Sequence, residues 1–304
     1  MNKKELRASF LLLVCAFVWG STFVAQSSAA ESVPAFAFLA SRSFVGSFAL
    51  LILALVFSKI KPKKQRGASI SKHFGVGCLC GVALFVASAC QQYGMTLGTG
   101  AGKAGFLTAL YLIFVPILEF CLFRRNPGLI VVIGSTFALV GLFLLCGIGN
   151  TETSFSIGDL LTALCGLCFA IHILIIDRFA GSLDGILLSC IQFFVCAVLS
   201  LLASLLFEEA SFSVVGNAYG SILYAGLLSS ALAYTLQIIG QRNCPPTVAT
   251  VLMSLESVFA LLCEGVIALW FSKPFPIGYT EAFGCLLMFV GVLLAQNPFR
   301  RKTK

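Results

Sequence analysis

Residues 81–119 read GVALFVASACQQYGMTLGTGAGKAGFLTALYLIFVPILE, and residues 226–264 read GLLSSALAYTLQIIGQRNCPPTVATVLMSLESVFALLCE. Shifted by 145 positions, the two stretches align without a gap. Matches between leucines or alanines arise easily in apolar sequences, whereas polar residues that match in register are harder to dismiss. The polar pairs in register are Gln92 with Gln237 and Glu119 with Glu264. The sequence therefore contains an internal repeat.

The composition indicates that the chain lies in a membrane. Of its 304 residues, 59% are hydrophobic and 11% are charged, and the mean hydropathy is +1.01. Soluble domains contain roughly 45–50% apolar and about 25% charged residues. A soluble fold of this length could not bury so much apolar surface, so the expected solvent is a lipid bilayer. The same composition excludes disordered, fibrous and nucleic-acid-binding proteins.

Ten apolar segments are each long enough to cross a bilayer, which takes about 20 residues in a helix. The connections between them are too short to form a soluble domain. Because lipid offers no partner to backbone polar groups, and because the segments are too long for barrel strands, all ten are expected to be helices. The predicted spans are 8–29, 34–58, 73–95, 103–123, 128–148, 157–177, 185–206, 217–240, 247–271 and 277–296.

The basic residues predict the orientation of the chain. Of the 20 Lys and Arg residues, 17 fall on one side, in connections or near the two termini. Cytoplasmic segments are rich in Lys and Arg, so both termini are expected in the cytoplasm, in a multi-pass plasma-membrane protein. Three basic residues do not follow this pattern. Lys103 is at the end of a predicted helix on the opposite side of the membrane, Lys273 is in a loop on that side, and Arg42 is inside a span. The net charge of +8 therefore reflects topology, and no nucleic-acid partner is expected.

Five helices in each repeat predict two halves of opposite orientation, residues 1–150 and 151–304. An odd number of spans makes the second copy enter the membrane from the other side. Inverted repeats are typical of secondary transporters, which bind substrate near the midplane between the copies. Residues 3–30 also resemble a signal peptide, whose cleavage would leave nine spans. A shift of 149 lays the first span on the sixth, which favours its retention.

Five short motifs follow in order on the expected spans. They are Trp19-Gly20-Ser21-Thr22-Phe23, Ala40-Ser41-Arg42-Ser43-Phe44, Leu107-Thr108-Ala109-Leu110-Tyr111 running to Pro116, Tyr234-Thr235-Leu236-Gln237 leading to Pro245-Pro246-Thr247, and Leu255-Glu256-Ser257-Val258-Phe259-Ala260. With ten helices as five plus five, they make the chain resemble the drug/metabolite transporter superfamily, EamA-like family. Ser257 replaces a proline common in relatives, and Cys168 replaces a tryptophan, so no substrate is carried over from a relative.

The resemblance implies a transporter of small organic solutes, often outward, without an ATPase domain. It also implies a central cavity lined by spans 1, 3, 4, 6, 8 and 9. Polar residues inside the spans are candidates for this site, because such groups are costly in lipid and are functional by default. The predicted substrate-cavity residues are Trp19, Ser21, Thr22, Gln92, Tyr111, His172, Tyr234, Gln237 and Glu256.

Glu256 lies about 15 Å deep in its span, close to the midplane, and has Tyr111 as its repeat partner. It could hold a proton, pair with a substrate ammonium, or serve as a structural hydrogen-bonding group. The residues proposed for coupling or gating are Glu256, His172, Glu264 and Arg42. Arg42 could bind a substrate carboxylate or neutralise a glutamate such as Glu264. The peripheral place of span 2 in the resemblance favours a structural role for Arg42.

His172 could relay protons, because histidine titrates near neutral pH. It shares a helix face with Cys165 and Cys168, and these three residues could bind a soft metal. No second span with metal ligands is evident, so neither a metal nor another cofactor is expected.

These features predict a secondary-active transporter that works by alternating access, and not an enzyme. Its expected role is the export of amino acids or related polar metabolites, with protons as the candidate coupling ion. Export of cationic, drug-like compounds is an open alternative, because a nearly apolar wall with Glu256 suits them too. A membrane-embedded enzyme is less favoured, because the sequence shows no His-Glu-x-x-His motif, paired aspartates or serine elbow. The oligomeric state is left open.

Overall fold

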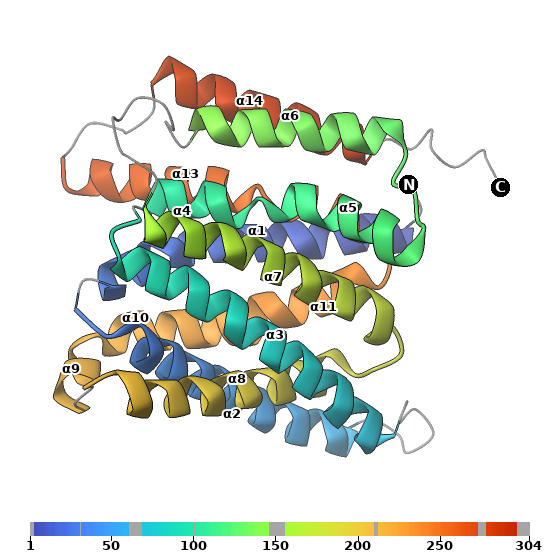
Figure 1. Ribbon diagram of the computed structural model, residues 1–304. Helices are drawn as coiled ribbons and strands as arrows, with labels where there is room; N and C mark the ends of the chain where they lie inside the picture. Colours follow the sequence, from blue (N-terminus) through green and yellow to red (C-terminus); the bar gives the residue numbers. More distant parts are fainter. Residues whose placement is uncertain are drawn as a thin grey trace.

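The computed structural model describes residues 3–30, 32–60, 69–99, 101–145, 156–209, 212–272 and 278–296. All regular structure in these ranges is helical, as predicted (Figure 1). The helices are α1 (Lys3–Ala30), α2 (Ala35–Ile60), α3 (Ile70–Thr96), α4 (Ala101–Thr108), α5 (Tyr111–Phe123), α6 (Leu129–Leu145), α7 (Ile157–Phe179), α8 (Gly185–Phe207), α9 (Phe212–Asn217), α10 (Tyr219–Tyr224), the π-helix η2 (Ala225–Ala233), α11 (Tyr234–Gln241), α12 (Pro246–Met253), α13 (Glu256–Trp270) and α14 (Tyr279–Ala295).

Eight stretches of the described chain are long and apolar enough to cross a membrane. They coincide with eight of the ten predicted spans. The other two, predicted at 128–148 and 277–296, form α6 and α14, which have 17 residues each. At about 1.5 Å per residue, each is about 25 Å long, which is near the lower limit for a helix that crosses a bilayer. The helices thus support a multi-pass membrane protein.

Three predicted spans are not the continuous helices that were expected. Span 103–123 divides into α4 and α5, and span 247–271 divides into α12 and α13. Span 217–240 consists of α10, η2 and α11 after the last residue of α9. The turns at Ala109–Leu110 and Ser254–Leu255 contain neither glycine nor proline, so the sequence lacks the usual signal for a helix break.

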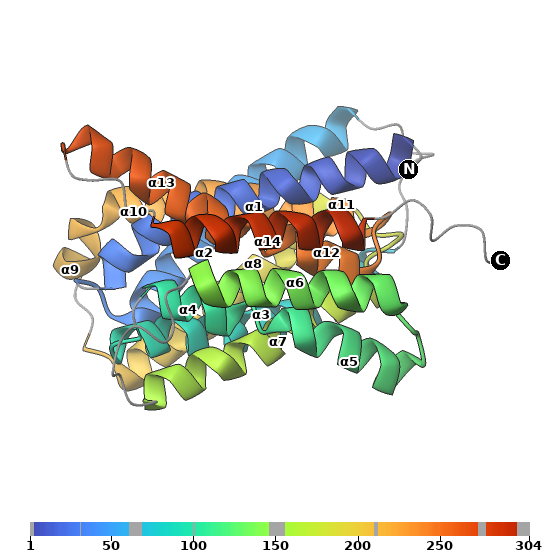
Figure 2. The same ribbon diagram turned by 90° about the horizontal axis from the view of Figure 1, so that it is seen from above.

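Helices from the two parts of the sequence pack on each other throughout the bundle. α6 packs along α14, and this pair lies side by side in both views (Figures 1 and 2). α1 packs on η2, α11, α12 and α13, while α7 packs on α3, α4 and α5. The second set of contacts repeats the first with the two parts exchanged. Each of α1 and α7 therefore covers a broken span of the other part.

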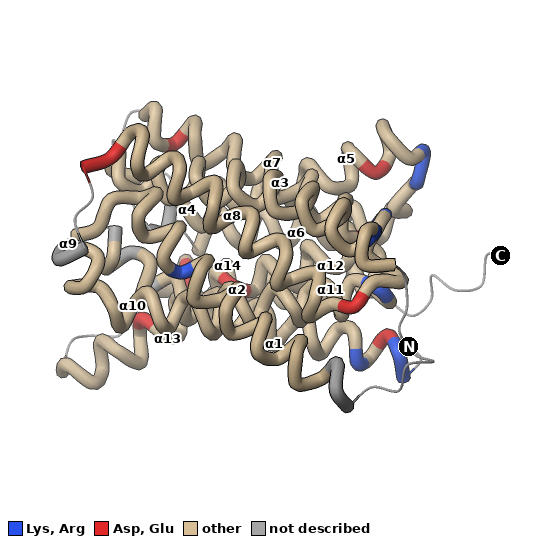
Figure 3. The backbone as a smooth tube through the Cα atoms, turned by 90° about the horizontal axis from the view of Figure 1, so that it is seen from below, with Lys and Arg blue, Asp and Glu red and all other residues tan. Residues whose placement is uncertain are grey.

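Charged residues gather at the two ends of the bundle, with most of the described Lys and Arg at the end where α1 begins (Figure 3). Glu5, Arg125, Asp177 and Arg242 line one pocket at this end, which we call the basic end. The connections that follow α5, α7 and α11 thus meet near the start of α1, as their basic residues predicted. Residues 61–68, which carry much of the predicted basic charge, and Lys273 lie outside the described residues.

Candidate functional site

The two broken spans change direction at positions that are 145 residues apart. At each turn, some backbone N–H groups donate to the carbonyl three residues earlier, instead of the carbonyl four residues earlier as in an α-helix. The matching bonds run from Leu110 N to Leu107 O and from Leu255 N to Leu252 O, both 3.3 Å, then from Leu112 N to Ala109 O (2.9 Å) and from Ser257 N to Ser254 O (3.3 Å). The two turns therefore have the same backbone structure in both parts of the sequence.

The first residues after these turns are Tyr111 at the start of α5 and Glu256 at the start of α13. The Tyr111 hydroxyl donates a hydrogen bond of 3.2 Å to Oε1 of Glu256. Both residues are 4% exposed. A carboxyl group so deeply buried needs a hydrogen-bond or charge partner, because its desolvation is costly. The residues that the repeat makes equivalent thus meet and bond to each other.

A cavity of about 50 Å³ surrounds this contact. Half of its lining comes from residues before position 150 and half from residues after it. The lining residues are Trp19, Phe23, Gln26, Arg42, Gln91, Thr108 and Tyr111, then Phe169, Ile173, Ser229, Tyr234, Gln237, Met253 and Glu256. Sites for organic ligands usually measure roughly 300–1,000 Å³. The structure therefore has a contracted cavity, with room for a few water molecules.

Arg42 lies on the wall of this cavity, contrary to the peripheral position expected for its span. It is 5% exposed, and its Nη1 donates a 2.8 Å hydrogen bond to Oε1 of Gln26. Its guanidinium also lies over the ring of Phe38, 5.7 Å from the ring centroid. Within the described chain it forms no ion pair with a carboxylate. A pairing with Glu264, one of the alternatives open for Arg42, does not occur in the described chain, where Glu264 is exposed on α13.

Three further predicted residues line the cavity with Tyr111 and Glu256. Trp19 of α1 packs edge-on against Tyr234 of α11, with ring centroids 4.9 Å apart. Gln237 lies one turn beyond Tyr234 on the same helix. Trp19 Nε1 and Gln237 Oε1 are buried and have no hydrogen-bond partner among the described residues. These two atoms are an unused donor and an unused acceptor on the wall, beside the unused Nε of Arg42.

The other predicted cavity residues lie outside the lining. The hydroxyls of Ser21 and Thr22 donate to carbonyls of their own helix. Gln92 is buried behind the wall, whereas the preceding residue, Gln91, reaches the cavity and donates to Thr108 Oγ1 at 2.9 Å. One residue turns a helix by about 100°, which explains why adjacent glutamines face different surroundings.

His172 forms a second layer behind the cavity. Its Nε2 is 3.1 Å from Oε1 of Gln192, and its ring packs edge-on against Tyr234. Cys165 contacts Thr108 instead, with Sγ 3.4 Å from Oγ1. In the described ranges, the face shared by Cys165, Cys168 and His172 does not form a cluster able to hold a metal ion.

Sequence reasoning missed several residues of the wall, and helical spacing could have found many of them. Phe23 and Gln26 follow Trp19 at i+4 and i+7, so all three share one face of α1. Phe169 and Ile173 are likewise four residues apart on α7. Ser229 lies in η2, where a π-helical segment widens the turn, and π-helical turns frequently occur at functional sites. No residue spacing indicated that segment.

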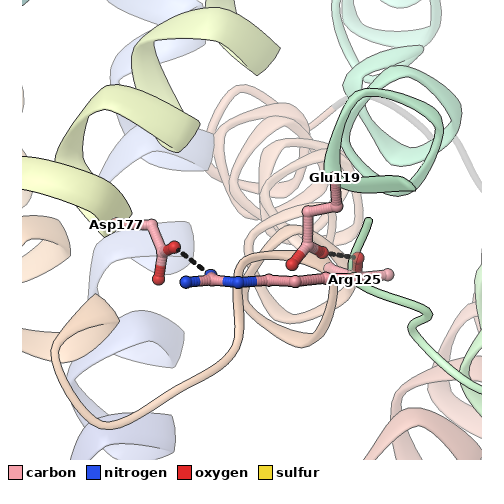
Figure 4. A network of polar contacts seen from close by, with 4 residues as sticks. Glu119, Arg125 and Asp177 are labelled. Atoms are coloured by element: carbon pink, nitrogen blue, oxygen red, sulfur yellow. Dashed lines mark hydrogen bonds and ion pairs between the residues drawn. The ribbon is translucent and has the colours of Figure 1, made fainter. Parts of the chain in front are cut away.

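A second polar network lies at the basic end of the bundle (Figure 4). Arg125, after α5, forms a 2.7 Å ion pair with Asp177 of α7. Glu119, one turn before the end of α5, accepts a hydrogen bond from the Thr247 hydroxyl of α12. A pocket of about 660 Å³ lies between these connections and the start of α1. The network therefore links α5 to two helices of the second part of the sequence.

Curated relatives align with nearly the whole chain. A protein of Archaeoglobus fulgidus named "Uncharacterized transporter" is 28% identical over 291 residues, covering 96% of this chain and 86% of that protein. The "Uncharacterized transporter YwfM" of Bacillus subtilis is 26% identical over 301 residues, covering 97% and 96%. These names indicate a transporter rather than an enzyme, and imply a small solute and membrane lipid as partners.

The fold also occurs among solved structures. One crystal structure superposes with a TM-score of 0.74 at 19% identity, over 98% of this chain and 99% of that chain. The model of the EamA-like transporter family matches twice, at residues 6–147 and again at residues 156–296. These two matches cover most of the sequence and bear out the resemblance that its motifs suggested. The chain belongs to the EamA-like transporter family.

Proposed function

We propose that the chain is a secondary-active exporter of amino acids or related small polar metabolites in the plasma membrane. The observation that carries the proposal is the bond between Tyr111 and Glu256 on the cavity wall. Equivalent residues of two copies can touch only close to the axis that relates the copies. We therefore treat residues 1–150 and 151–304 as inverted repeats, with the cavity on their axis.

Alternating access follows from this arrangement. When two inverted copies exchange their conformations, a cavity open to one side of the membrane becomes open to the other. The cavity of about 50 Å³ must expand to admit a metabolite. The broken spans offer a place for this movement, since α1 and α7 pack across the turns. The basic end faces the cytoplasm in this proposal, and its polar network closes that side.

Glu256 is the proposed coupling group. Its buried carboxyl accepts a bond from Tyr111, and no cation pairs with it in the described part of the chain. A buried carboxylate without a cation is unstable, so the carboxyl holds either a proton or a substrate ammonium. If the proton and the substrate ammonium replace each other at Glu256, inward movement of protons is coupled to export of the substrate. His172 contributes less directly, because it lies behind the wall.

Cationic, drug-like compounds are the second candidate class. Glu256 and the aromatic side chains of Trp19, Phe169 and Tyr234 favour them. Arg42 disfavours them, because a permanent cation would enter a small cavity that already holds a guanidinium. Amphoteric metabolites satisfy both charges and therefore fit the cavity better.

The test is flux into proteoliposomes driven by a pH gradient, with Glu256→Gln as the decisive variant. The matched control is Glu209→Gln, which makes the same change after α8, at an exposed position that has no proposed role. We expect pH-driven flux to be lost in the first variant and retained in the second, with equal expression. Unchanged flux in Glu256→Gln would refute the coupling role. Absence of counterflow for every amino acid and polar metabolite tried would refute the transporter proposal.

A further inference from the structure

We infer that Arg42, held in place by Gln26, binds the carboxylate of the transported solute, while Glu256 binds its ammonium group. The preferred substrates are then zwitterions with an apolar side chain. This inference rests on the proposed function and narrows its substrate class. It also selects substrate recognition for Arg42, for which the sequence favoured a structural role and left carboxylate binding and gating open.

The surroundings of Arg42 are those of a receptor group rather than of a structural ion pair. An arginine inside a membrane span is costly, and a structural arginine is usually neutralised by a carboxylate. Here the described partner is the neutral Gln26, and Nε is buried without a hydrogen-bond partner. The titratable groups that interact electrostatically with it are Cys196 and Tyr234, a thiol and a phenol. The guanidinium therefore keeps unused capacity for a carboxylate, which it binds well through paired N–H groups.

Gln26 fixes the guanidinium at the cavity. Its amide oxygen occupies one N–H of Arg42 and adds no negative charge. A glutamate of the same shape at this position would instead neutralise Arg42 from within the protein. The choice of an amide leaves the positive charge available to a ligand.

The rest of the wall matches the other parts of a zwitterion. Glu256 supplies the negative charge, and it forms no ion pair with Arg42 within the described residues. Phe23, Phe169, Ile173 and Met253 supply apolar surface for a side chain. A ligand that brings both an ammonium and a carboxylate satisfies both buried charges at once. A simple amine or a simple carboxylate satisfies only one of them.

The chain provides its own probe for a binding test. It has two tryptophans, Trp19 on the cavity wall and Trp270, which is 85% exposed at the end of α13. In a Trp270→Phe background, the fluorescence of Trp19 reports on the cavity alone. Three ligands with the same apolar side chain are compared. L-Leucine carries both an ammonium and a carboxylate, 3-methylbutylamine carries only the ammonium, and 4-methylpentanoate carries only the carboxylate. Binding is measured on the purified full-length protein in detergent.

We expect leucine to bind most tightly of the three. Arg42→Gln should raise the Kd of leucine and 4-methylpentanoate at least about tenfold, since it removes a charged hydrogen-bond donor from the carboxylate. The Kd of 3-methylbutylamine should change less than about threefold. Gln26→Glu should give the same pattern while Arg42 is still present, which covers the case that Arg42→Gln does not fold. Glu256→Gln should have the opposite effect: it should raise the Kd of 3-methylbutylamine and leave that of 4-methylpentanoate nearly unchanged.

The inference is overturned if neither carboxylate ligand changes Trp19 fluorescence at millimolar concentration. It is also overturned if Gln26→Glu leaves both of their Kd values unchanged. Glu209→Gln is the control, and it should leave all three affinities as they are. If the expected binding pattern occurs but proteoliposomes show no leucine counterflow, the binding site stands and the transporter proposal fails. The two claims therefore fail separately.

Discussion

At the turn between α4 and α5 the new helix begins with Tyr111, and at the turn between α12 and α13 it begins with Glu256. Both turns have the same tightened backbone bonds. A glycine of the other part of the sequence lies close to each break. Gly166 on α7 approaches Leu107 O at the end of α4, and Gly20 on α1 approaches Glu256 O at the start of α13. The backbone shape is therefore shared, whereas a carboxyl side chain stands at only one of the two turns. A repeated hinge can serve movement in both parts, while proton and substrate chemistry is confined to one.

Exchanging the side chains of Tyr111 and Glu256 should have the largest effect on flux and stability. Tyr111→Glu places two carboxyls at the contact, and Glu256→Tyr places two phenols there and removes the proposed coupling charge. We expect each single variant to lose flux in proteoliposomes. The double variant rebuilds the phenol–carboxyl bond in the reverse direction, so part of the flux and the melting temperature should return. The readouts are counterflow and the thermal unfolding of purified protein.

A swapped double variant that is no more active or stable than the worse single variant would contradict the near-symmetry of the contact. The control is the exchange Gln91→Thr with Thr108→Gln, which reverses another bonded pair of the wall within one part of the sequence. No repeat relates these two positions, so we expect no recovery from that exchange.

Gly20 and Gly166 give the next largest effect. A Cβ at Gly20 would lie 2.5 Å from Glu256 O and 2.7 Å from Phe259 Cβ. A Cβ at Gly166 would lie 2.8 Å from Leu107 O. Overpacking costs typically 1–3 kcal/mol, so Gly20→Ala and Gly166→Ala should each lower the melting temperature by several degrees, the first by more. Thermal unfolding in detergent measures both.

Gly75→Ala is the matched control for these substitutions, because a Cβ there would meet no atom within 4 Å. It removes the glycine from a helix without crowding a turn, and we expect unchanged or slightly higher stability. Equal losses of stability for all three alanine variants would show that close contact with the broken spans does not determine the effect.

The repeat and the helical spans could be predicted from the sequence, but the turns could not. Polar residues in register, such as Gln92 with Gln237, made the repeat visible, and hydropathy made the spans visible. Ala109, Leu110, Ser254 and Leu255 carry no glycine or proline signal. The helix ends beside these turns pack against Gly20 and Gly166, which lie far away in the sequence. Tertiary contacts of this kind leave no local pattern to read.

The site was predicted in part, for a related reason. Tyr111, Glu256, Trp19, Tyr234 and Gln237 were found as polar or aromatic residues within spans, and all of them line the cavity. Residue type alone does not say which face of a helix points inward. Ser21, Thr22, Gln92 and His172 were therefore included although they lie outside the lining. Arg42 was named for coupling or gating, but its span was expected to be peripheral to the cavity. The helical phase set by Trp19, Phe23 and Gln26 would have sharpened the prediction.

Removing only the Tyr111 hydroxyl should have a smaller effect than exchanging the two side chains. Tyr111→Phe keeps the ring and removes the bond to Glu256 Oε1. A hydrogen bond to a charged group contributes about 1.5–3 kcal/mol, and one to a neutral group about 0.5–1.5. We expect roughly a threefold to tenfold weaker affinity for amines and a smaller change for carboxylates. Titration of Trp19 fluorescence in the Trp270→Phe background measures it, and equal changes for both ligand classes would contradict a specific bond to Glu256.

The basic end should give the smallest effect on stability and flux. The Arg125–Asp177 pair is partly exposed, with side-chain exposures of 48% and 16%. Exposed ion pairs contribute about 0–1 kcal/mol, so Arg125→Gln should shift the melting temperature by only a few degrees. If this pair holds the basic end closed, the variant should open that end more often. Cys244, which lines the same pocket, can report such opening.

Burial raises the pKa of the Cys244 thiol to about 12. Because the thiolate is the reactive form, labelling by a maleimide should be slow at pH 8 and rise about tenfold per pH unit below that pKa. Opening of the basic end hydrates the thiol and returns its pKa toward about 8.5, so Arg125→Gln should label severalfold faster at pH 8. Subtracting the labelling of a Cys244→Ser variant removes the signal of other cysteines, including the exposed Cys121. Equal rates with and without Arg125 would show that the ion pair does not hold this end closed.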